Sequence, residues 1–396
     1  MSTLTERPAG QPQRGWVASL AQFNWRSYGM LIALGIIVLL FTWLTDGIFL
    51  SPRNVAQLMR QAALLVVVAS GVALLIIQRE IDLSIGSAVY LAGLAAATAQ
   101  TQWGWSTAPA ILVALAVGMA MGAWQGFWVS RFAIPSFVVT LSGLLAFRGI
   151  GYVWSNAATY APMNRSFGAL SESFVPPLAS AILVLALLVV FTAGVAWRWR
   201  RQRTRFGGDS VPASRLLRPV AWATIGALVL LYPALGYRGI PMAVVISLVV
   251  VGCLAFLTLG TTFGRKMYAI GGNREAAHLS GINIRRTLFV SFVIMGVIYA
   301  IGGILVTARL NAIAPSVGEF LELEAIAAAV IGGISLGGGI GTVFGALIGA
   351  MLLVAVDNGM SLMNVSSFIQ LVVKGLLLGF AVVFDVLTRP GGRRLH

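Results

Sequence analysis

The feature that most constrains this chain is a succession of apolar runs, each close to the length that crosses a lipid bilayer. A bilayer core about 30 Å thick needs about 20 helical residues, and runs of this order recur along the whole sequence. Hydrophobic residues make up 58% of the 396 residues and charged residues only 10%, so a water-soluble fold would lack the polar surface to cover itself. The sequence therefore predicts an all-α, polytopic transmembrane helical bundle, because helices satisfy their own backbone hydrogen bonds in lipid.

We expect about twelve crossings, several of them short enough to be tilted, broken or re-entrant. The expected segments are Tyr28–Thr45, Leu58–Ile77, Ile85–Ala99, Ala108–Phe127, Pro135–Trp154, Pro177–Ala196, Val220–Leu235, Pro241–Gly260, Thr287–Val306, Leu323–Leu336, Ile340–Val356 and Phe368–Leu387. Residues 1–27 and 389–396 form polar tails around a membrane domain of residues 28–388. The first apolar run has no small-residue cleavage site behind it, which predicts a retained anchor.

The basic residues predict the orientation of the chain. Its formal net charge is +15, and cytoplasmic loops are the ones enriched in Lys and Arg. With both termini inside, the basic loops fall on the cytoplasmic side, with single exceptions at Arg53, Arg165, Arg238 and Arg309. The internal basic residues are Arg131, the run "RWRRQRTR" with Arg215 and Arg218, then Arg265, Lys266, Arg274, Arg285, Arg286, Arg389, Arg393 and Arg394.

One polar loop, residues 261–286, contains the sequence "GRKMYAIGGNREAAHLSGINIRR" from Gly264 to Arg286. Asn273 is a suitable N-cap, Glu275 falls in the first turn, and Gly281 suits the left-handed residue after a last turn. A helix of about seven residues cannot hold itself together in water, so it needs a surface to dock on. Its apolar face, Ala276, Ala277 and Leu279 with Arg274 and His278 at the rim, fits either a groove of a soluble partner or the lipid headgroups.

The segment "EAAHLSG" from Glu275 to Gly281 resembles the EAA-x-x-x-G loop of permease subunits in ABC importers. "QREIDLSIGS", "PSFVVTLSGLLAFRGI", "ELEAIAAAVIGGISLGGGIGTVFGALIGA" and "DNGMSLM" are similar to the monosaccharide branch of that family, and most of all to its D-xylose-transporting members. The Ile-x-Leu-Pro ending of the wider signature is absent after Gly281. The hairpin of residues 177–235, with its basic loop, is additional to a family core of about 10 crossings.

The resemblance implies a permease that imports a monosaccharide across the bacterial inner membrane by alternating access. It implies a homodimer, two ATP-binding subunits, a periplasmic sugar-binding protein, contact with membrane lipid and no nucleic acid. The coupling helix that docks on the ATPase would comprise Asn273, Arg274, Glu275, Ala276, Ala277, Leu279 and Gly281. ATP and Mg would be bound by the partner, with no cofactor in this chain.

The residues agree with a chain that has no catalytic, cofactor or metal site of its own. Lys266 and Lys374 are the only lysines and neither follows Gly, so a G-x-x-x-x-G-K-[ST] phosphate loop cannot occur. His278, His396 and Cys253 are too few and too scattered for a metal set, and Cys253 is expected to pack in an apolar run.

Two interrupted helices are the best pointer to the sugar path, because freed backbone groups can bind a polar solute. They lie around Ile81–Gly86, with Asp82 and Ser84, and around Ile334–Gly341, with Ser335; close packing is the alternative explanation. Further candidates are Trp124, Phe147, Arg148 and Asn358. Arg148, Asp82, Asp357 and Lys374 lie near or within apolar runs, where an ion pair that pins helices explains them equally well.

On the external side, Glu319 and Glu322 could receive a binding protein, or they could form a solvated acidic loop. A rival function is a proton-coupled secondary sugar transporter acting alone, which needs titratable carboxylates deep in the spans. Only Asp357 and Asp385 come near this requirement late in the chain, both at segment ends.

Overall fold

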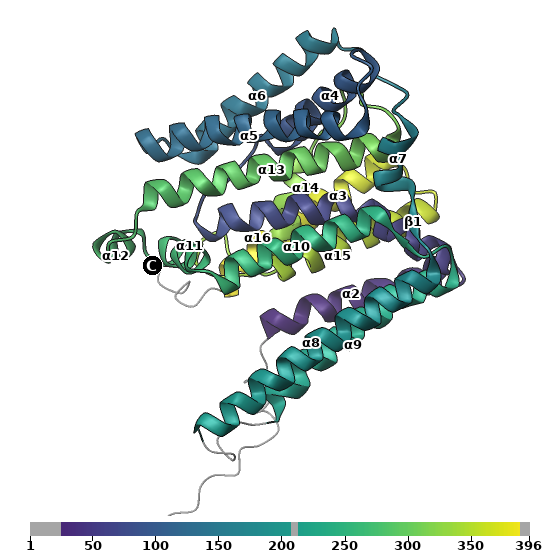
Figure 1. Cartoon of the computed structure of the whole chain (residues 1–396), viewed down its shortest axis with the longest axis vertical. Helices are drawn as coiled ribbons and strands as arrows, with labels where there is room; N and C mark the ends of the chain where they lie inside the picture. Colours follow the sequence, from purple (N-terminus) through teal and green to yellow (C-terminus); the bar gives the residue numbers. More distant parts are fainter. Residues whose placement is uncertain (1–24, 207–212, 389–396) are drawn as a thin grey trace, which may run out of the picture.

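The computed structural model describes residues 25–206 and 213–388 (Figure 1). The predicted tails therefore lie outside the described residues, apart from residues 25–27. Each of the twelve expected apolar segments overlaps a helix, which confirms the polytopic helical bundle, although residues 332–336 and 340–342 lie outside helices. These helices are α2 (Trp25–Leu44), α3 (Pro52–Ile77), α4 (Ile85–Thr101), α5 (Thr107–Phe132), α6 (Ser136–Ser155), α8 (Pro177–Phe206), α9 (Ser214–Gly236), α10 (Met242–Gly260), α13 (Ile284–Leu310), α14 (Leu321–Ile331), α15 (Val343–Leu362) and α16 (Ser367–Thr388).

Eight of the described helices are long and apolar enough to cross a membrane: α3, α5, α6, α8, α9, α10, α13 and α15. The described apolar parts of α2 and α16 are shorter, and α14 has only 11 residues. At 1.5 Å per residue α14 is about 16 Å long, half the bilayer core. The shorter elements between these helices are η1 (Ile48–Leu50), α7 (Arg165–Glu172), α11 (Thr262–Gly272), α12 (Arg274–Leu279), β1 (Phe174–Val175) and β2 (Ile240–Pro241).

Successive helices run in alternate directions between two ends of the bundle (Figure 1). We call them the α12 end, which carries α11 and α12, and the α7 end, which carries α7 and the two strands. Met30 near the start of α2 lies beside Gly333, and Asp385 near the end of α16 lies 3.4 Å from the Ser335 hydroxyl. Because residues 332–342 belong to the α12 end, both ends of the described chain lie there too.

The centre of the bundle is formed by α3, α4 and α13, whose side chains are buried along most of their length. Small residues allow their backbones to approach closely, as is typical of membrane helices. An added Cβ on Gly118 of α5 would lie 2.3 Å from the Gly296 carbonyl of α13, so these two helices touch through backbone. Cys253 on α10, expected to be a packing thiol, is exposed on the outer face of that helix.

Helices α8 and α9 form the additional hairpin, which leans away from the bundle beside α2 (Figure 1). Its base is closed by the antiparallel pair β1 and β2, with Val175 opposite Ile240. The Ser180 hydroxyl accepts from Ile240 N at 3.1 Å and donates to the Val175 carbonyl at 2.8 Å. Two short strands and one hydroxyl therefore hold the start of α8 beside the end of α9.

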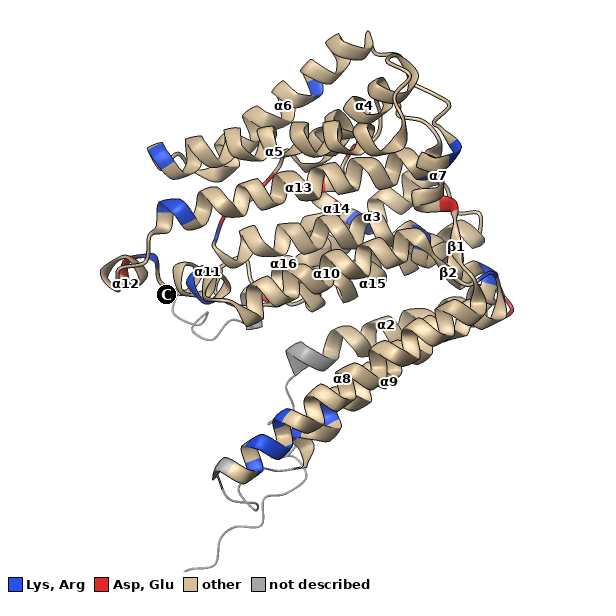
Figure 2. Cartoon of the chain, viewed as in Figure 1, with Lys and Arg blue, Asp and Glu red and all other residues tan. Residues whose placement is uncertain are grey.

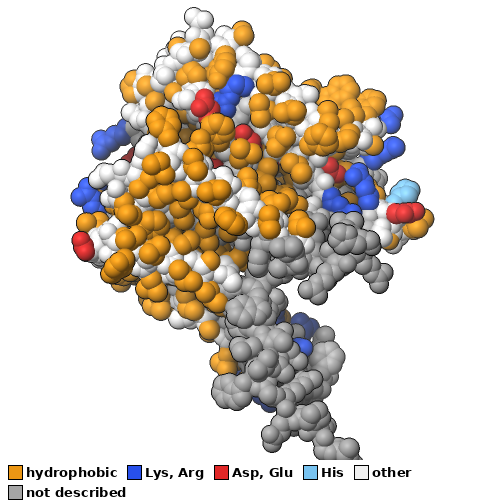
Figure 3. Space-filling model, turned by 180° about the vertical axis from the view of Figure 1, so that it is seen from behind, with side chains coloured by type: hydrophobic (Ala, Val, Ile, Leu, Met, Phe, Trp, Pro, Cys, Tyr) orange, Lys and Arg blue, Asp and Glu red, His pale blue; other side chains and the backbone are white. Residues whose placement is uncertain are grey.

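The molecular surface is that of a multi-pass membrane protein. Apolar side chains cover the face seen in Figure 3, interrupted by few charges. The outer helices α8 and α16 expose large residues such as Leu178, Val190, Phe368 and Phe380. Because water would penalise so large an apolar area, this belt is suited to lipid or to a second membrane chain.

Candidate functional site

Helix α12 has the caps that its sequence predicts. The Asn273 side-chain oxygen accepts from Ala276 N at 2.9 Å, Glu275 lies in the first turn, and Gly281 has a left-handed φ of 77°. A side chain at Gly281 would be strained in that conformation. These contacts confirm the expected N-cap and the left-handed glycine, and the helix of 6 residues ends at Leu279 with Ser280 as its cap, one residue earlier than expected.

Helix α11, directly before α12, was not expected from the sequence. Thr261 caps it by accepting from Gly264 N at 3.2 Å, and Gly264, Met267, Ile270 and Gly271 are buried on one side. This three-and-four spacing is the signal that could have revealed the helix. Together α11 and α12 form a short helical arm at the α12 end of the bundle.

The exposed face of α12 is smaller than expected. Leu279 is 81% exposed, and Glu275 and Ala276 are also exposed. Ala277, which the sequence placed on the docking face, is only 4% exposed and is covered within the single chain. The surface that α12 offers to a partner therefore consists of one carboxylate and two apolar side chains, with the exposed Arg274 and His278 beside them.

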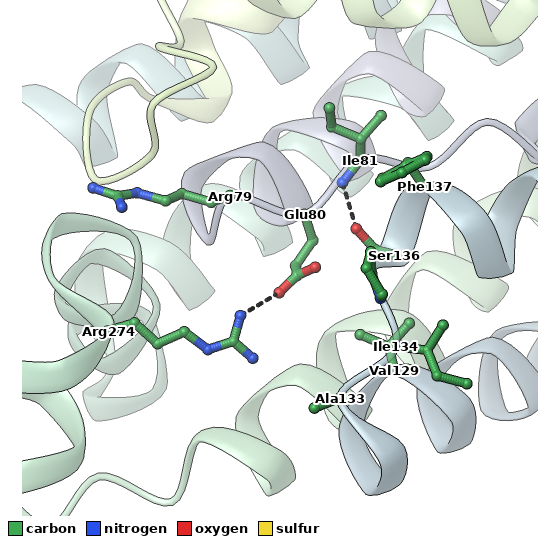
Figure 4. A pocket seen from close by; sticks show the side chains of 10 residues that line it. Arg79, Glu80, Ile81, Val129, Ala133, Ile134, Ser136, Phe137 and Arg274 are labelled. Carbon is green, nitrogen blue, oxygen red and sulfur yellow. Dashed lines mark hydrogen bonds and ion pairs between the residues drawn. The ribbon is translucent and has the colours of Figure 1, made fainter.

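An ion pair ties α12 to the α3–α4 connection. Arg274 Nη1 lies 3.1 Å from Glu80 Oε1, and Glu80 is almost fully buried (Figure 4). Burial raises the pKa of the Glu80 carboxyl above its ordinary value, while the Ser136 hydroxyl and the Arg274 guanidinium oppose the rise. The pair borders a hollow of ≈ 320 Å³, and a second hollow of ≈ 540 Å³ separates the α12–α13 connection from the end of α5.

Both predicted helix interruptions are present. The first, break 1, comprises residues 78–84 between α3 and α4, and the second, break 2, comprises residues 332–342 between α14 and α15. They touch each other, because Arg79 Nε donates to the Gly337 carbonyl. Beside this contact, Gly339 N donates at 2.8 Å to the carbonyl of Ile77, the last residue of α3. A Cβ on Gly271 of α11 would lie 1.7 Å from that same carbonyl. The two breaks and the helical arm thus meet at one point of backbone contact.

Asp82 and Ser84 of break 1 belong to a buried polar cluster rather than to an open path. The Asp82 carboxylate accepts from Ser84 N at 2.9 Å and from Ser84 Oγ at 2.7 Å, and it also accepts from the Tyr299 hydroxyl. Gln125 of α5 donates to Ser84 Oγ. All four residues are at most 1% exposed. The cluster therefore fixes break 1 against α5 and α13, with its polar groups satisfied inside the protein.

The aromatic candidates lie on α5 and α6. Trp124 is 40% exposed on the outer surface, and its ring meets that of buried Phe147 edge-on at 5.7 Å. Arg148, the next residue, donates from Nη1 to the carbonyls of Pro315 and Val317, each at 2.8 Å. Its guanidinium also lies 5.3 Å from the centre of the Tyr90 ring. Arg148 thus binds the segment that follows α13.

That segment, residues 311–320, is a re-entrant loop. It starts at the α7 end, where Ile313 pairs with Tyr160, and then returns into the bundle until Gly318 meets Gly86. A Cβ on Gly86 would lie 1.9 Å from the Gly318 carbonyl and 2.7 Å from Glu322 Oε2. Gly86 is 15 residues from the end of α4 at Thr101, which corresponds to about 22 Å.

Glu322 therefore lies against Gly86 within the bundle and is half-buried, whereas the sequence placed it on an external surface. Hydropathy could not reveal this, because a loop that turns back into the bundle reads like one that stays outside. Glu319 is exposed, one residue beyond the Gly86 contact.

The remaining candidates are paired with one another across helices. Lys374 of α16 lies 2.6 Å from Glu324 of α14 and 2.8 Å from Asp357 of α15. Asn358 exchanges two hydrogen bonds with Asn54 of α3, at 2.8 and 3.2 Å. Ser335 is buried in break 2, where its hydroxyl also accepts from Gly337 N at 3.3 Å. These contacts link α3, α14, α15 and α16, and they leave Lys374 with two carboxylate partners.

Across the described ranges, no three His, Cys, Asp or Glu side chains gather where they could hold a metal ion.

Comparison with known proteins gives a consistent result. A family model described as the branched-chain amino acid transport system permease component matches residues 54–382. A xylose transport system permease protein of Escherichia coli (strain K12) is 41% identical over 389 residues, 98% of each chain. The corresponding protein of Haemophilus influenzae is 40% identical over 92% of this chain and 97% of its own length. A ribose import permease protein of Escherichia coli is 30% identical over 90% of this chain and 92% of its own. No solved structure matches the chain.

Proposed function

Since the chain belongs to the branched-chain amino acid transport system permease family, we propose that it is the membrane subunit of an ATP-binding-cassette importer for D-xylose. The observation that carries the proposal is the 41% and 40% identity to two xylose permeases over nearly the whole chain, against 30% for a ribose permease. The α8–α9 hairpin is retained within the 98% of the chain that aligns.

Helix α12 is the docking point for an ATP-binding subunit in this proposal. It projects from the bundle, it is capped at both ends, and its exposed Glu275, Ala276 and Leu279 have no partner within the described chain. A shallow apolar patch with a charge at its edge is typical of a helix that enters a groove. ATP and Mg would be held by that subunit, and this chain would move without performing chemistry.

The α12 end would face the cytoplasm, with both termini on that side. Its loops carry Arg79, Arg131, Arg265, Lys266, Arg274, Arg285 and Arg286, and the outer turns of α8 add Arg198, Arg200, Arg201 and Arg203 (Figure 2). The α7 end has fewer basic residues, Arg53, Arg60, Arg165, Arg238 and Arg309, together with Asp46 and Glu172. This asymmetry is the one that Lys and Arg show in membrane proteins.

The sugar path would run along the re-entrant loop. Arg148 and Glu322 lie deep in the bundle, yet each is only half-buried in the single chain. Charged side chains at such depth face a water-filled cavity or a protein neighbour far more often than lipid. We infer that two copies pair so that Gly86, Arg148 and Glu322 line the space between them, and that a periplasmic binding protein delivers the sugar near Glu319.

Proton-coupled transport by this chain alone is the rival function. Its relay would need carboxylates free to titrate within the spans. Asp82 accepts hydrogen bonds from Ser84 and from the Tyr299 hydroxyl inside a closed polar cluster, and Glu324 and Asp357 share Lys374 as a partner. An ion pair of this kind holds α14, α15 and α16 together. It therefore favours the membrane subunit of an ATP-driven importer over a proton-coupled transporter that acts alone.

A co-purification experiment tests the proposal. The tagged chain is expressed with its candidate ATP-binding subunit and sugar-binding protein, and Glu275→Arg is compared with Asp46→Arg, a charge reversal at the α7 end. We expect the ATPase to be retained by the parent and by Asp46→Arg and to be lost from Glu275→Arg. D-xylose uptake that persists in vesicles without any ATPase, driven by a proton gradient, would establish the rival function.

A further inference from the structure

The side chain of Arg79 joins the helical arm to both helix breaks. Arg79 lies in break 1, directly after α3, and its Nε donates to the carbonyl of Gly337 in break 2. Its Nη2 donates to the carbonyl of Gly272 at 3.0 Å. Gly272 is the last residue of α11, adjacent to the Asn273 cap of α12. One guanidinium thus spans three segments that are far apart in the sequence.

The carbonyls that Arg79 binds are suited to a cation. The last carbonyls of a helix have no partner within the helix and carry partial negative charge, and Gly272 is such a residue at the end of α11. The planar fork of arginine can bind two acceptors at once, which the compact ammonium of lysine cannot do in the same geometry.

The backbone of Arg79 gives a second, independent indication. Its φ is 66°, in the left-handed region, where a side chain is disfavoured and glycine is accommodated freely. A glycine would relieve this strain but would remove the guanidinium. An arginine at this strained position is explained if the contacts of its guanidinium group are needed for function.

The backbones of α3, α11 and break 2 are in close contact around Arg79. Gly339 N donates to the Ile77 carbonyl, and there is no room for a Cβ on Gly271 between them. A Cβ on Gly338 would lie 2.3 Å from Arg79 Cγ. The Tyr268 hydroxyl of α11 also donates to the Gly341 carbonyl of break 2 at 2.8 Å. A displacement of the arm is therefore passed to both breaks rather than absorbed by loose loops.

The far side of the arm is, in contrast, poorly supported. Two hollows lie between α12 and the ends of α5 and α6, and the Arg274–Glu80 ion pair bridges from the arm to break 1 beside them (Figure 4). The arm is fixed on the side of the breaks and has space on the other, which is the arrangement expected of a lever.

We propose that Arg79 is the positioning residue that transmits movement of the α11–α12 arm to the two helix breaks, and so couples ATP hydrolysis to sugar transport. This role rests on the proposed function. Break 1 continues into Gly86, which contacts the re-entrant loop at Gly318, so the linkage extends from the arm to the inferred sugar path. Coupling free energies between distant sites commonly correspond to changes of about 5–150-fold.

The test uses the complete transporter in proteoliposomes, with D-xylose uptake and ATP hydrolysis measured in the same vesicles. Arg79→Gly removes the guanidinium without backbone strain, Arg79→Lys keeps the charge, and Arg131→Ala removes an exposed arginine from the same end of the bundle. For Arg79→Gly we expect the ATP-binding subunit to be retained and the sugar transported per ATP to fall at least about fivefold. Arg79→Lys should give an intermediate ratio, and Arg131→Ala the parental one.

Two results would overturn the coupling role. One is an Arg79→Gly transporter whose uptake per ATP stays within about twofold of the parent, below the coupling range. The other is loss of the ATP-binding subunit from Arg79→Gly, which would mean that Arg79 merely supports the fold of the arm. Failure of the proposed function itself is read from the parent, which would then show no ATP-dependent uptake.

Discussion

The contact of Gly271 with the end of α3 and with break 2 supports the most specific prediction. Replacing Gly271 with alanine places a Cβ 1.7 Å from the Ile77 carbonyl and 2.6 Å from Gly339 N. No side chain can rotate away from this clash, because both atoms belong to backbone. The adjacent Gly272 has nothing within 4 Å of its Cβ position, so Gly272→Ala is a matched control in the same helical turn.

The expected cost has two parts. Overpacking by one methyl group costs about 1–3 kcal/mol, and separating the backbones removes the Gly339 N to Ile77 O hydrogen bond, which leaves buried groups unpaired at about 1–3 kcal/mol. Gly271→Ala should therefore destabilise the arm and break region by roughly 3 kcal/mol, the middle of these ranges. Gly272→Ala should be neutral or slightly stabilising, because alanine favours helix by up to about 1 kcal/mol.

Two assays on the purified transporter separate the variants. For a chain of this size a loss of 3 kcal/mol lowers the apparent melting temperature by roughly 3–6 °C, from the inverse scaling with length. Amide hydrogen exchange should also become faster in residues 262–272 and 332–342 of Gly271→Ala, with little change elsewhere. If Gly271→Ala has the same melting temperature and amide exchange rates as Gly272→Ala, the backbone contact at the base of the arm does not exist. Movement of the arm would then not be transmitted to the breaks through this contact.

Three further predictions concern single interactions. Lys374→Met leaves Glu324 and Asp357 without their cation and should lower the free energy of unfolding by roughly 3 kcal/mol. The triple variant that adds Glu324→Gln and Asp357→Asn should recover most of the melting temperature. A triple variant that does not recover it would contradict the ion-pair assignment. Asn273→Ala should cost about 1 kcal/mol of α12 stability and speed amide exchange at Ala276, whereas Asn273→Asp should not, since either side chain caps the helix. Arg274→Ala removes the charge partner of buried Glu80. Burial already raises the pKa of the Glu80 carboxyl, so the stability that Glu80 contributes is present at low pH and is lost as the pH rises. The variant should therefore be more destabilised at pH 8 than at pH 5 in paired thermal melts.

The spans and the caps of α12 could be predicted because both depend on local sequence. An apolar run of bilayer length becomes a helix wherever it is placed, and Asn273 and Gly281 act on neighbours three or four residues away. The positions of Glu322 and Ala277 could not be predicted in the same way. Glu322 is drawn into the bundle by the contact between Gly318 and Gly86, which are more than 200 residues apart in the sequence, and Ala277 is turned inward by the way the arm packs.

The candidate site shows the same division. The sequence marks both breaks, since Ile-x-Leu followed by glycine recurs in each, but it does not reveal that the breaks touch. Asp357 and Lys374 could be noted individually as charges near apolar runs, while the ion pair with Glu324 requires three helices to be in place. Arg79 carried no signal beyond a family-like segment, because its significance lies in two carbonyls contributed by distant loops.

The strand pair at the base of the α8–α9 hairpin has a practical consequence for protein engineering. Val175 and Ile240 are register partners on adjacent antiparallel strands, so a two-residue turn could join them directly and excise everything between. The faces uncovered by the excision, around Met59 and Val244, are apolar and would be acceptable to lipid. The same junction could accept a fluorescent reporter or a purification module in place of the hairpin, which makes it a natural graft point on an otherwise continuous membrane domain.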